Sequence, residues 1–280
     1  MPGWRRWPRA ASLPWSPPRV YHQLLAQRAH DAGMRVYVLN ARDVHFYAKA
    51  MGARGKTDRV DAVLIARYAA EHHAKLHDWE PGDSVHKRVE ELLGRRATVV
   101  TKRESVRQAF KGDRDLAGEL KQLDGSFDLF LAALDARIDA LIAADDALAT
   151  GRRRIASVTG FGPLGSALLA VLFARIEFAN GDAVVAYSGL DPRPNDSGKK
   201  RGTRQLSKRG PAHLRRQLYL CGFAASHSKA LKPLYQALRA KGFATTEAFV
   251  ILGRKLLRAA FAIWKSGEPW DVAKILPKPP

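Results

Sequence analysis

The first third of the chain alternates between helical and extended spacing of its apolar residues. Residues 21–32 repeat apolar side chains on one helical face, and Gly33 follows where such a helix would end. Residues 34–39 (MRVYVL) are rich in Val and Tyr, which predicts a buried strand. Two further helices are expected, at 44–51 and after Thr57, a residue that can cap a helix. This order is typical of an α/β domain. Because one strand cannot form a sheet, we expect the sheet to lack its other members.

The middle of the chain repeats apolar residues every seven positions, as coiled coils do. One repeat covers residues 85–110 and a second covers 127–148, with a charged segment containing three glycines between them. Asp145 interrupts the second repeat where an apolar residue is expected. The pattern predicts an antiparallel coiled-coil hairpin, either folded on itself or paired with another subunit. The alternative is a helical connector packed on its own domain.

Apolar helices predominate in the last part of the chain. A glycine-rich turn at 158–165 leads into an apolar helix at 166–176, and three more helices are expected before residue 264. Residues 1–19 are rich in Trp and Pro and have no period. The predicted fold class is therefore α/β followed by mostly α. We expect an irregular tail (1–19), a remnant of an α/β domain (20–82), the coiled-coil hairpin (83–150), a helical C-terminal domain (151–270) and a second tail (271–280).

Charge points to a polyanionic partner. The 280 residues include 47 Lys and Arg against 27 Asp and Glu, for a formal net charge of +20. Such a surplus destabilises a compact chain unless a polyanion neutralises it, so nucleic acid is the first expected partner and an anionic membrane surface the second. The longest apolar run, 167–174, is too short to span a membrane, and no apolar signal region follows the N-terminal arginines. A single cysteine, Cys221, excludes a disulfide framework, so we expect a soluble cytoplasmic protein.

Two acids form the first candidate site. Asp58 and Asp61 lie three residues apart near the start of a predicted helix, so their carboxylates share a face. Close carboxylates repel unless a cation lies between them, and oxygen ligands suit Mg²⁺ or Mn²⁺, the metals of phosphodiester transfer. The alternative is that both acids stabilise the positive end of the helix or pair with Arg54 or Arg59.

The glycine-rich turn is the second candidate. Gly160 and Gly162 flank an apolar residue and precede an apolar helix, which resembles the hairpin of a helix-hairpin-helix motif. Glycines there let backbone N–H groups approach a phosphate without reading its sequence. The alternative is a simple glycine turn between two core helices.

The third candidate is a basic segment, defined as residues 193–216, that contains one acid, Asp196. Its basic residues are Arg193, Lys199, Lys200, Arg201, Arg204, Lys208, Arg209, Arg215 and Arg216. This composition favours a polyanion-binding surface over a merely solvated run of charges. Within it, the hydroxyl of Ser197 could attack a phosphodiester while the cations stabilise the developing charge. The alternative is that Ser197 is an ordinary turn residue.

These three features, in this order, resemble the DEDD-type insertion-sequence transposases, the insertion-sequence one-ten family, also described as bridge-RNA-guided recombinases. The resemblance covers residues 21–270 and depends on the patterns K-T-D-x-x-D-A, VTGFGPLGSALLAVL and S-G-L-x-P-x-x-x-x-S-G-K-x-R-G. It implies a ribonuclease-H-like (resolvase-like) N-terminal domain with four metal-binding acids, of which Asp58 and Asp61 match the last two. It also implies a serine transposase domain in which Ser197 matches the catalytic serine that links to DNA.

The resemblance also implies partners. Subunits would assemble through the coiled coil, placing the serine of one beside the acids of another, and a guide RNA from the element would pair with DNA. The basic segment and the hairpin glycines would contact the backbone of that duplex or RNA. We therefore expect a bacterial protein that is associated with the nucleoid.

One departure from the family concerns the metal site. No Asp or Glu precedes Asp31, so the first two acids of the family's site have no match. We therefore expect an N-terminally truncated or mis-started copy in which Mg²⁺ binding is weak or lost. Three functions stay open: an active transposase or recombinase, a catalytically dead nucleic-acid-binding fragment, and a helix-hairpin-helix protein that binds DNA junctions.

Overall fold

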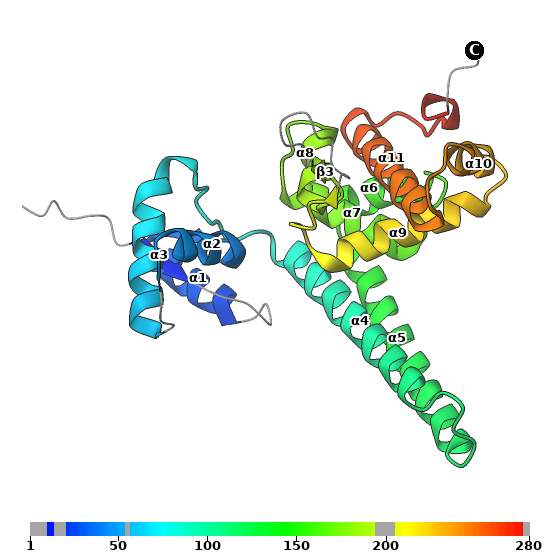
Figure 1. Ribbon diagram of the computed structural model, residues 1–280, viewed down its shortest axis with the longest axis horizontal. Coiled ribbons are helices and arrows are strands. Elements are labelled where there is room, and N and C mark those ends of the chain that lie inside the picture. The colour runs from blue at the N-terminus through cyan, green and yellow to red at the C-terminus, as the bar shows by residue number, and fades with distance from the viewer. Residues whose placement is uncertain (1–9, 14–20, 54–56, 194–204, 277–280) are drawn as a thin grey trace, which may run out of the picture. The chain divides into compact units, whose positions relative to one another are not determined.

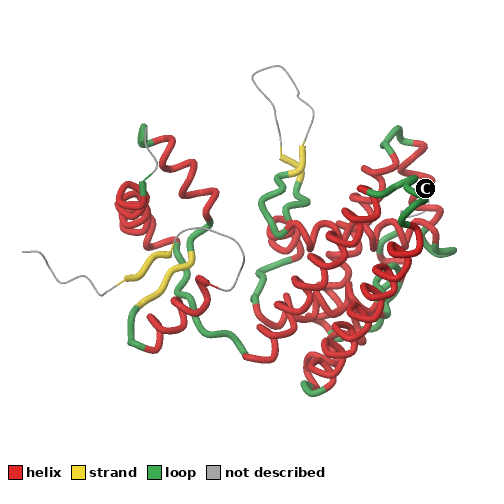
Figure 2. Tube along the Cα trace, turned by 90° about the horizontal axis from the view of Figure 1, so that it is seen from below, coloured by secondary structure: helices red, strands yellow, loops and turns green. Residues whose placement is uncertain are grey.

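The structure is a computed structural model that describes residues 10–13, 21–53, 57–193 and 205–276. The chain divides into two units, residues 1–82 and 83–280 (Figure 1). Helices predominate in both, and the described strands are short (Figure 2), which confirms the expectation of a largely helical protein.

A parallel pair of strands organises the first unit. β1 (Ala10–Leu13) pairs along its full length with β2 (Arg35–Val38), and α1 (Tyr21–Asp31) connects the two strands. This β–α–β order provides the crossover that parallel strands require. The expectation that residues 1–19 are irregular is therefore wrong for β1. The sequence AASL has no β-branched residue and no alternation, so nothing in it marks a strand before its partner is known.

Helices pack on both faces of β2. Consecutive strand residues point to opposite sides of a sheet. Accordingly, Val36 packs with Ala26 of α1, whereas Tyr37 packs with Ile65 of α3 (Asp58–His72). The other helical elements of this unit are α2 (Ala41–Ala50) and the short 3₁₀ helix η1 (His73–Lys75).

Local signals in the sequence set the ends of these helices. Thr57 caps α3, as predicted, because its Oγ1 accepts a hydrogen bond from the N–H of Val60 at 3.3 Å. Gly33 follows α1 with φ of +74°, and its N–H donates to the carbonyl of His30 at 2.8 Å. A residue without Cβ adopts this left-handed conformation easily, so the glycine ends the helix.

The second unit begins with an antiparallel helical hairpin, α4 (Ser84–Ala109) and α5 (Ala117–Ala143) (Figure 1). Ion pairs join the two helices. Arginines later in α4 pair with aspartates earlier in α5, as antiparallel helices require. These pairs are Arg96 with Asp135, Arg103 with Asp124 and Asp128, and Arg107 with Asp124. A hairpin is thus present where one was predicted, while its pairing with another subunit stays a prediction.

Asp145 ends the hairpin. α5 stops at Ala143, and the Asp145 carboxylate caps the next helix by accepting a hydrogen bond from the N–H of Leu148 at 2.9 Å. The predicted repeat over 127–148 therefore spans two helices, and the missing apolar residue marks the break between them.

The main hydrophobic core contains residues of the remaining helices of this unit together with residues of the hairpin, such as Val89 of α4 and Ile138 of α5. The remaining elements are α6 (Asp146–Ala156), α7 (Pro163–Arg175), α8 (Gly181–Ser188), β3 (Pro192–Arg193), β4 (Gln205–Leu206), α9 (Ala212–His227), α10 (Lys232–Ala240), α11 (Thr245–Ser266) and η2 (Val272–Lys274). α7 is buried from Gly165 to Val171. α9 and α11 approach closely at Gly222 and Gly253, where an added Cβ would collide with the backbone of the facing helix. Among the described helices, none has the length and apolar composition needed to cross a membrane.

Candidate functional site

The two candidate metal ligands lie in the first turn of α3. Asp58 is exposed and Asp61 is half-buried, one helical turn further along. Within the described part of the chain neither carboxylate makes a hydrogen bond or an ion pair, so the suggested partner Arg59 does not neutralise them there. Mg²⁺ commonly binds one or two carboxylates and completes its shell with water and substrate phosphates. The pair fits such a two-carboxylate site, although no group of three or more possible ligand side chains occurs in the described residues.

Hydrogen bonds join the described residues on the two sides of positions 194–204. β3 and β4 are antiparallel, with Arg193 opposite Gln205. The hydroxyl of Ser207 donates to the carboxylate of Asp191, and the Ser207 N–H donates to the Asp191 carbonyl at 2.9 Å. Asp191 and Arg193 are therefore held close to Gln205 and Ser207.

Several described cations of the basic segment are exposed and have no counterion among the described residues. Arg193, Lys208, Arg209 and Arg216 are exposed, and none of the four forms an ion pair with a described residue. Arg215 is half-buried and donates to the carbonyl of Gly210. The other candidates of this segment, Ser197, Lys199, Lys200, Arg201 and Arg204, lie outside the described residues. The described flanks thus present positive charge available to a polyanion.

The two candidate glycines face different surroundings. Gly160 has φ of +103°, and a Cβ there would lie 2.7 Å from the Cys221 carbonyl oxygen and 2.9 Å from the Ala225 Cβ. Gly162 is exposed, and a Cβ there would meet nothing within 4 Å. Packing against α9 explains the glycine at 160, which favours the core-turn reading for that residue. Of the two glycines, only Gly162 is exposed, at the start of α7, so a phosphate contact there stays a prediction.

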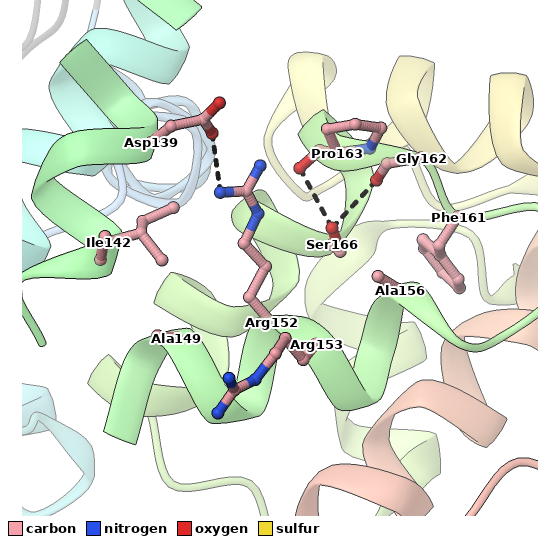
Figure 3. A pocket seen from close by; sticks show the side chains of 11 residues that line it. Asp139, Ile142, Ala149, Arg152, Arg153, Ala156, Phe161, Gly162, Pro163 and Ser166 are labelled. Carbon is pink, nitrogen blue, oxygen red and sulfur yellow. Dashed lines mark hydrogen bonds and ion pairs between the residues drawn. The ribbon is translucent and has the colours of Figure 1, made fainter. Parts of the chain in front are cut away.

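An open pocket of about 480 Å³ lies beside this turn, between α5, α6 and α7 (Figure 3). Arg152 extends from α6 toward Asp139 of α5, with 2.7 Å between Nη1 and Oδ1. The fully buried Ser166 donates its hydroxyl to the carbonyls of Gly162 and Pro163, both at 3.0 Å. Its hydroxyl therefore serves the first turn of α7 and is not aimed at a substrate. Arg152 was not among the predicted residues, although the run of arginines at 152–154 just before the glycine turn is visible in the sequence.

A second arginine that the sequence analysis missed lies on α11. The Nε atom of Arg254 is buried and has no hydrogen-bond partner in the part of the chain that the structure describes. Burial lowers the pKa of Arg254, and the neighbouring Arg258 lowers it further, while Asp182 and Asp191 act in the opposite direction. The signal in the sequence was two arginines four residues apart, Arg254 and Arg258, among the many apolar residues of this helix.

Cys221 is not a candidate nucleophile. Its side chain is buried in the core, and burial raises the pKa of the thiol to about 12. The reactive form of cysteine is the thiolate, which is scarce at neutral pH for such a group.

Two family models match successive parts of the chain. Residues 152–236 match the family described as "Transposase IS116/IS110/IS902 family". Residues 11–112 match the DEDD model of IS110 elements, described as "Transposase". The first model covers the basic segment and the glycine turn, and the second covers β1 and the Asp58–Asp61 pair.

Curated proteins are similar over most of the chain. The pilin gene-inverting protein of Moraxella lacunata is 26% identical over 90% of this chain and 79% of its own length. The uncharacterized 42 kDa protein of insertion element IS900 from Mycobacterium paratuberculosis is 25% identical over 83% of this chain and 77% of its own length. The uncharacterized 43.6 kDa protein of insertion element IS110 from Streptomyces coelicolor is 28% identical over 50% of this chain and 34% of its own. The similarity therefore extends across both units.

Proposed function

The chain belongs to the IS110 family of insertion-sequence transposases, and we propose that it cleaves and rejoins DNA strands with Ser197 as nucleophile and a divalent metal at Asp58 and Asp61. Binding of DNA follows from membership of a transposase family. The observation that chiefly supports the proposed chemistry is the set of exposed, unpaired cations beside the segment that contains Ser197.

The proposed step is a transesterification at phosphorus. The Ser197 hydroxyl loses its proton as its oxygen forms a bond to phosphorus, and the bond to one deoxyribose oxygen breaks and that oxygen takes up a proton. Negative charge accumulates on the phosphoryl oxygens in the transition state. Fixed cations such as Arg193, Lys208 and Arg209 stabilise that charge more than they stabilise the substrate, which is the condition for catalysis. Rejoining reverses the step with a different deoxyribose hydroxyl.

Asp58 and Asp61 are the proposed metal ligands. A bound Mg²⁺ or Mn²⁺ would act as a Lewis acid toward phosphoryl oxygens. The two carboxylates meet the chemical requirement for such an ion because they are hard oxygen donors, lie one helical turn apart and are free of ion pairs with described residues. They leave most of the coordination shell to water and substrate.

We also assign the hairpin a role in assembly. Leu116, which precedes the first residue of α5, and Leu123 and Phe130 within α5 are spaced seven residues apart. All three are exposed, so they form an apolar stripe that α4 does not cover. Such a stripe is typical of a helix that packs on a further helix, and we propose that a second copy of the chain supplies that helix.

A guide RNA is the proposed second polyanion, because the net charge of +20 is suited to nucleic acid and the family resemblance implies such an RNA.

The test compares strand joining with DNA binding. We expect Ser197→Ala to abolish joining of element ends in Mg²⁺ while its Kd for the same DNA stays within about twofold of wild type, because only a transition-state interaction is removed. Ser105→Ala, which changes an exposed serine on α4, is the matched control and keeps full activity.

Two results would contradict the proposal. Full joining activity in Ser197→Ala would show that another group is the nucleophile. Wild-type protein that binds DNA with a steep salt dependence and yet never cleaves it would favour the second candidate, a binding protein without chemistry.

A further inference from the structure

Arg254 is a partly buried cation that has no counterion among the residues that the structure describes. It lies in the middle of α11, its Nε has no hydrogen-bond partner, and it forms no ion pair with any described residue. Other half-buried arginines of the described chain have oxygen partners. Arg96 pairs with Asp135, Arg103 with Asp124 and Arg152 with Asp139, and Arg215 donates to the carbonyl of Gly210.

The nearby carboxylates are already engaged. Asp182 accepts two hydrogen bonds from Arg258, at 2.9 Å from Nε and 2.7 Å from Nη2. Asp191 accepts the hydroxyl hydrogen bond of Ser207. Both acids lie close enough to Arg254 to influence its charge, yet neither bonds to it.

An unpaired, partly buried guanidinium is unfavourable in the free protein. Removing a charge from water costs free energy that only a partner charge or hydrogen bonds can offset. Buried polar atoms in native proteins are nearly always satisfied, so one that is not calls for an explanation such as an absent ligand. The missing partner of Arg254 should be an anion with oxygen acceptors.

The position of Arg254 in the fold indicates which anion binds to it. It lies one helical turn from Arg258, which packs against the start of α8, and close enough to Asp191 for the two charges to interact. Asp191 bonds to Ser207, and the exposed cations Arg193, Lys208 and Arg209 are near these two residues in the sequence. A small free anion needs no such extended positive surface, whereas a nucleic-acid backbone does.

We propose that Arg254 binds a phosphodiester of the nucleic-acid backbone and that this phosphate is the partner which the fold leaves open. The planar guanidinium can donate two parallel hydrogen bonds to the phosphate oxygens. DNA and RNA present the same group, so the site accepts either one. The inference rests on the proposed nucleic-acid function and adds a specific contact to it.

The experiment uses two charge-removing variants of the full chain, Arg254→Met and Lys255→Met. Lys255 is the next residue of the same helix, is half-buried and carries the same charge, so its variant controls for net charge alone. Fluorescence anisotropy measures Kd for a labelled DNA duplex and for a labelled single-stranded RNA at several salt concentrations. Urea unfolding without nucleic acid measures stability, and size-exclusion chromatography measures the oligomeric state.

For Arg254→Met we expect about a tenfold loss of affinity, since hydrogen bonds to charged groups contribute at least this much. The slope of log Kd against log salt should fall by about 0.9 with duplex DNA or about 0.7 with the single strand, as expected for one lost phosphate contact. The nucleic acid that shows this change is the one that Arg254 contacts. Lys255→Met should change Kd by less than about threefold. The urea midpoint of Arg254→Met should be equal to or above that of wild type, because the change removes an unpaired buried charge.

Each contrary result overturns the inference. An unchanged Kd and salt slope for both nucleic acids, with wild type binding normally, contradicts the role of Arg254 and leaves the proposed function intact. A lowered urea midpoint would show that Arg254 stabilises the fold, and a changed oligomeric state would identify its partner as a carboxylate of a second copy. Wild type that binds neither nucleic acid would overturn the proposed function itself.

Discussion

At the scale of single residues, two glycines in one turn have separate roles. Gly160 combines a left-handed backbone with close packing against the carbonyl of Cys221, so its lack of a side chain serves the core. Gly162 has open space where a Cβ would lie and is exposed at the start of α7. Only Gly162 has an exposed backbone that a phosphate could approach. Substitution of each glycine by alanine separates the two roles.

Gly160→Ala should lower the free energy of unfolding by about 2–4 kcal/mol, because strain at positive φ adds to overpacking against α9. Gly162→Ala is the matched control and should change stability by less than about 1 kcal/mol. Urea unfolding followed by circular dichroism measures both. Equal stability losses in the two variants would refute this assignment.

Part of the candidate site could be predicted from single residues. Thr57 caps α3 as its sequence position indicates, and this cap places Asp58 and Asp61 in the first turn. Arg254 could not be predicted in the same way, because a sequence does not show which arginines the fold buries or which carboxylates are already bonded. Pairing and burial depend on the packing of α8 against α11.

At the scale of elements, the start of α6 depends on one carboxylate. Asp145 accepts a hydrogen bond from the N–H of Leu148, and its other oxygen pairs with His86 Nε2 of α4 at 3.0 Å. The backbone bond from Leu148, followed by the His86 contact, lowers the pKa of Asp145. Asp145 thus connects α4 to the start of α6, and the pH dependence of stability measures how much this connection contributes.

Asp145→Ala should lower the free energy of unfolding by about 1–2 kcal/mol at neutral pH, the usual effect of losing a helix cap. A lowered native pKa means that the contribution is fully present above the pKa of an unfolded aspartate, about 3.9, and is lost as pH falls through the lower native value. The difference between variant and wild type should therefore shrink in acid. Asp145→Asn keeps a capping oxygen and should lose less stability at neutral pH. A difference for Asp145→Ala that is independent of pH, measured by urea unfolding from pH 2 to pH 7, would contradict this account.

Helices were predicted more successfully than strands, for a physical reason. α4 and α9 are long enough for their apolar spacing to repeat several times, and α3 has a local cap. β1 has four residues without alternation, and its hydrogen bonds go to β2, more than twenty residues away. Local sequence determines helices because their bonds are local, whereas a short parallel strand depends on its partner.

At the scale of the whole molecule, the surplus of positive charge is unevenly distributed. Arginines of the hairpin such as Arg96 and Arg103 pair with aspartates across it. The described cations of the basic segment lack such partners, and its composition has one acid against nine basic residues. The sequence predicted this contrast in composition, but only the structure shows which cations are already neutralised. The net charge of +20 therefore understates how strongly this one region attracts a polyanion.

The central claim is that Ser197 bonds to DNA during strand exchange. The most direct measurement incubates wild type with a plasmid carrying the element ends, Mg²⁺ and the element RNA, and then denatures the mixture during turnover. After digestion with nuclease and protease, mass spectrometry identifies any peptide that carries a nucleotide. The account predicts a nucleotide joined through a phosphodiester to the peptide that contains Ser197. Strand joining with no adduct, or with the adduct on another residue, would contradict it.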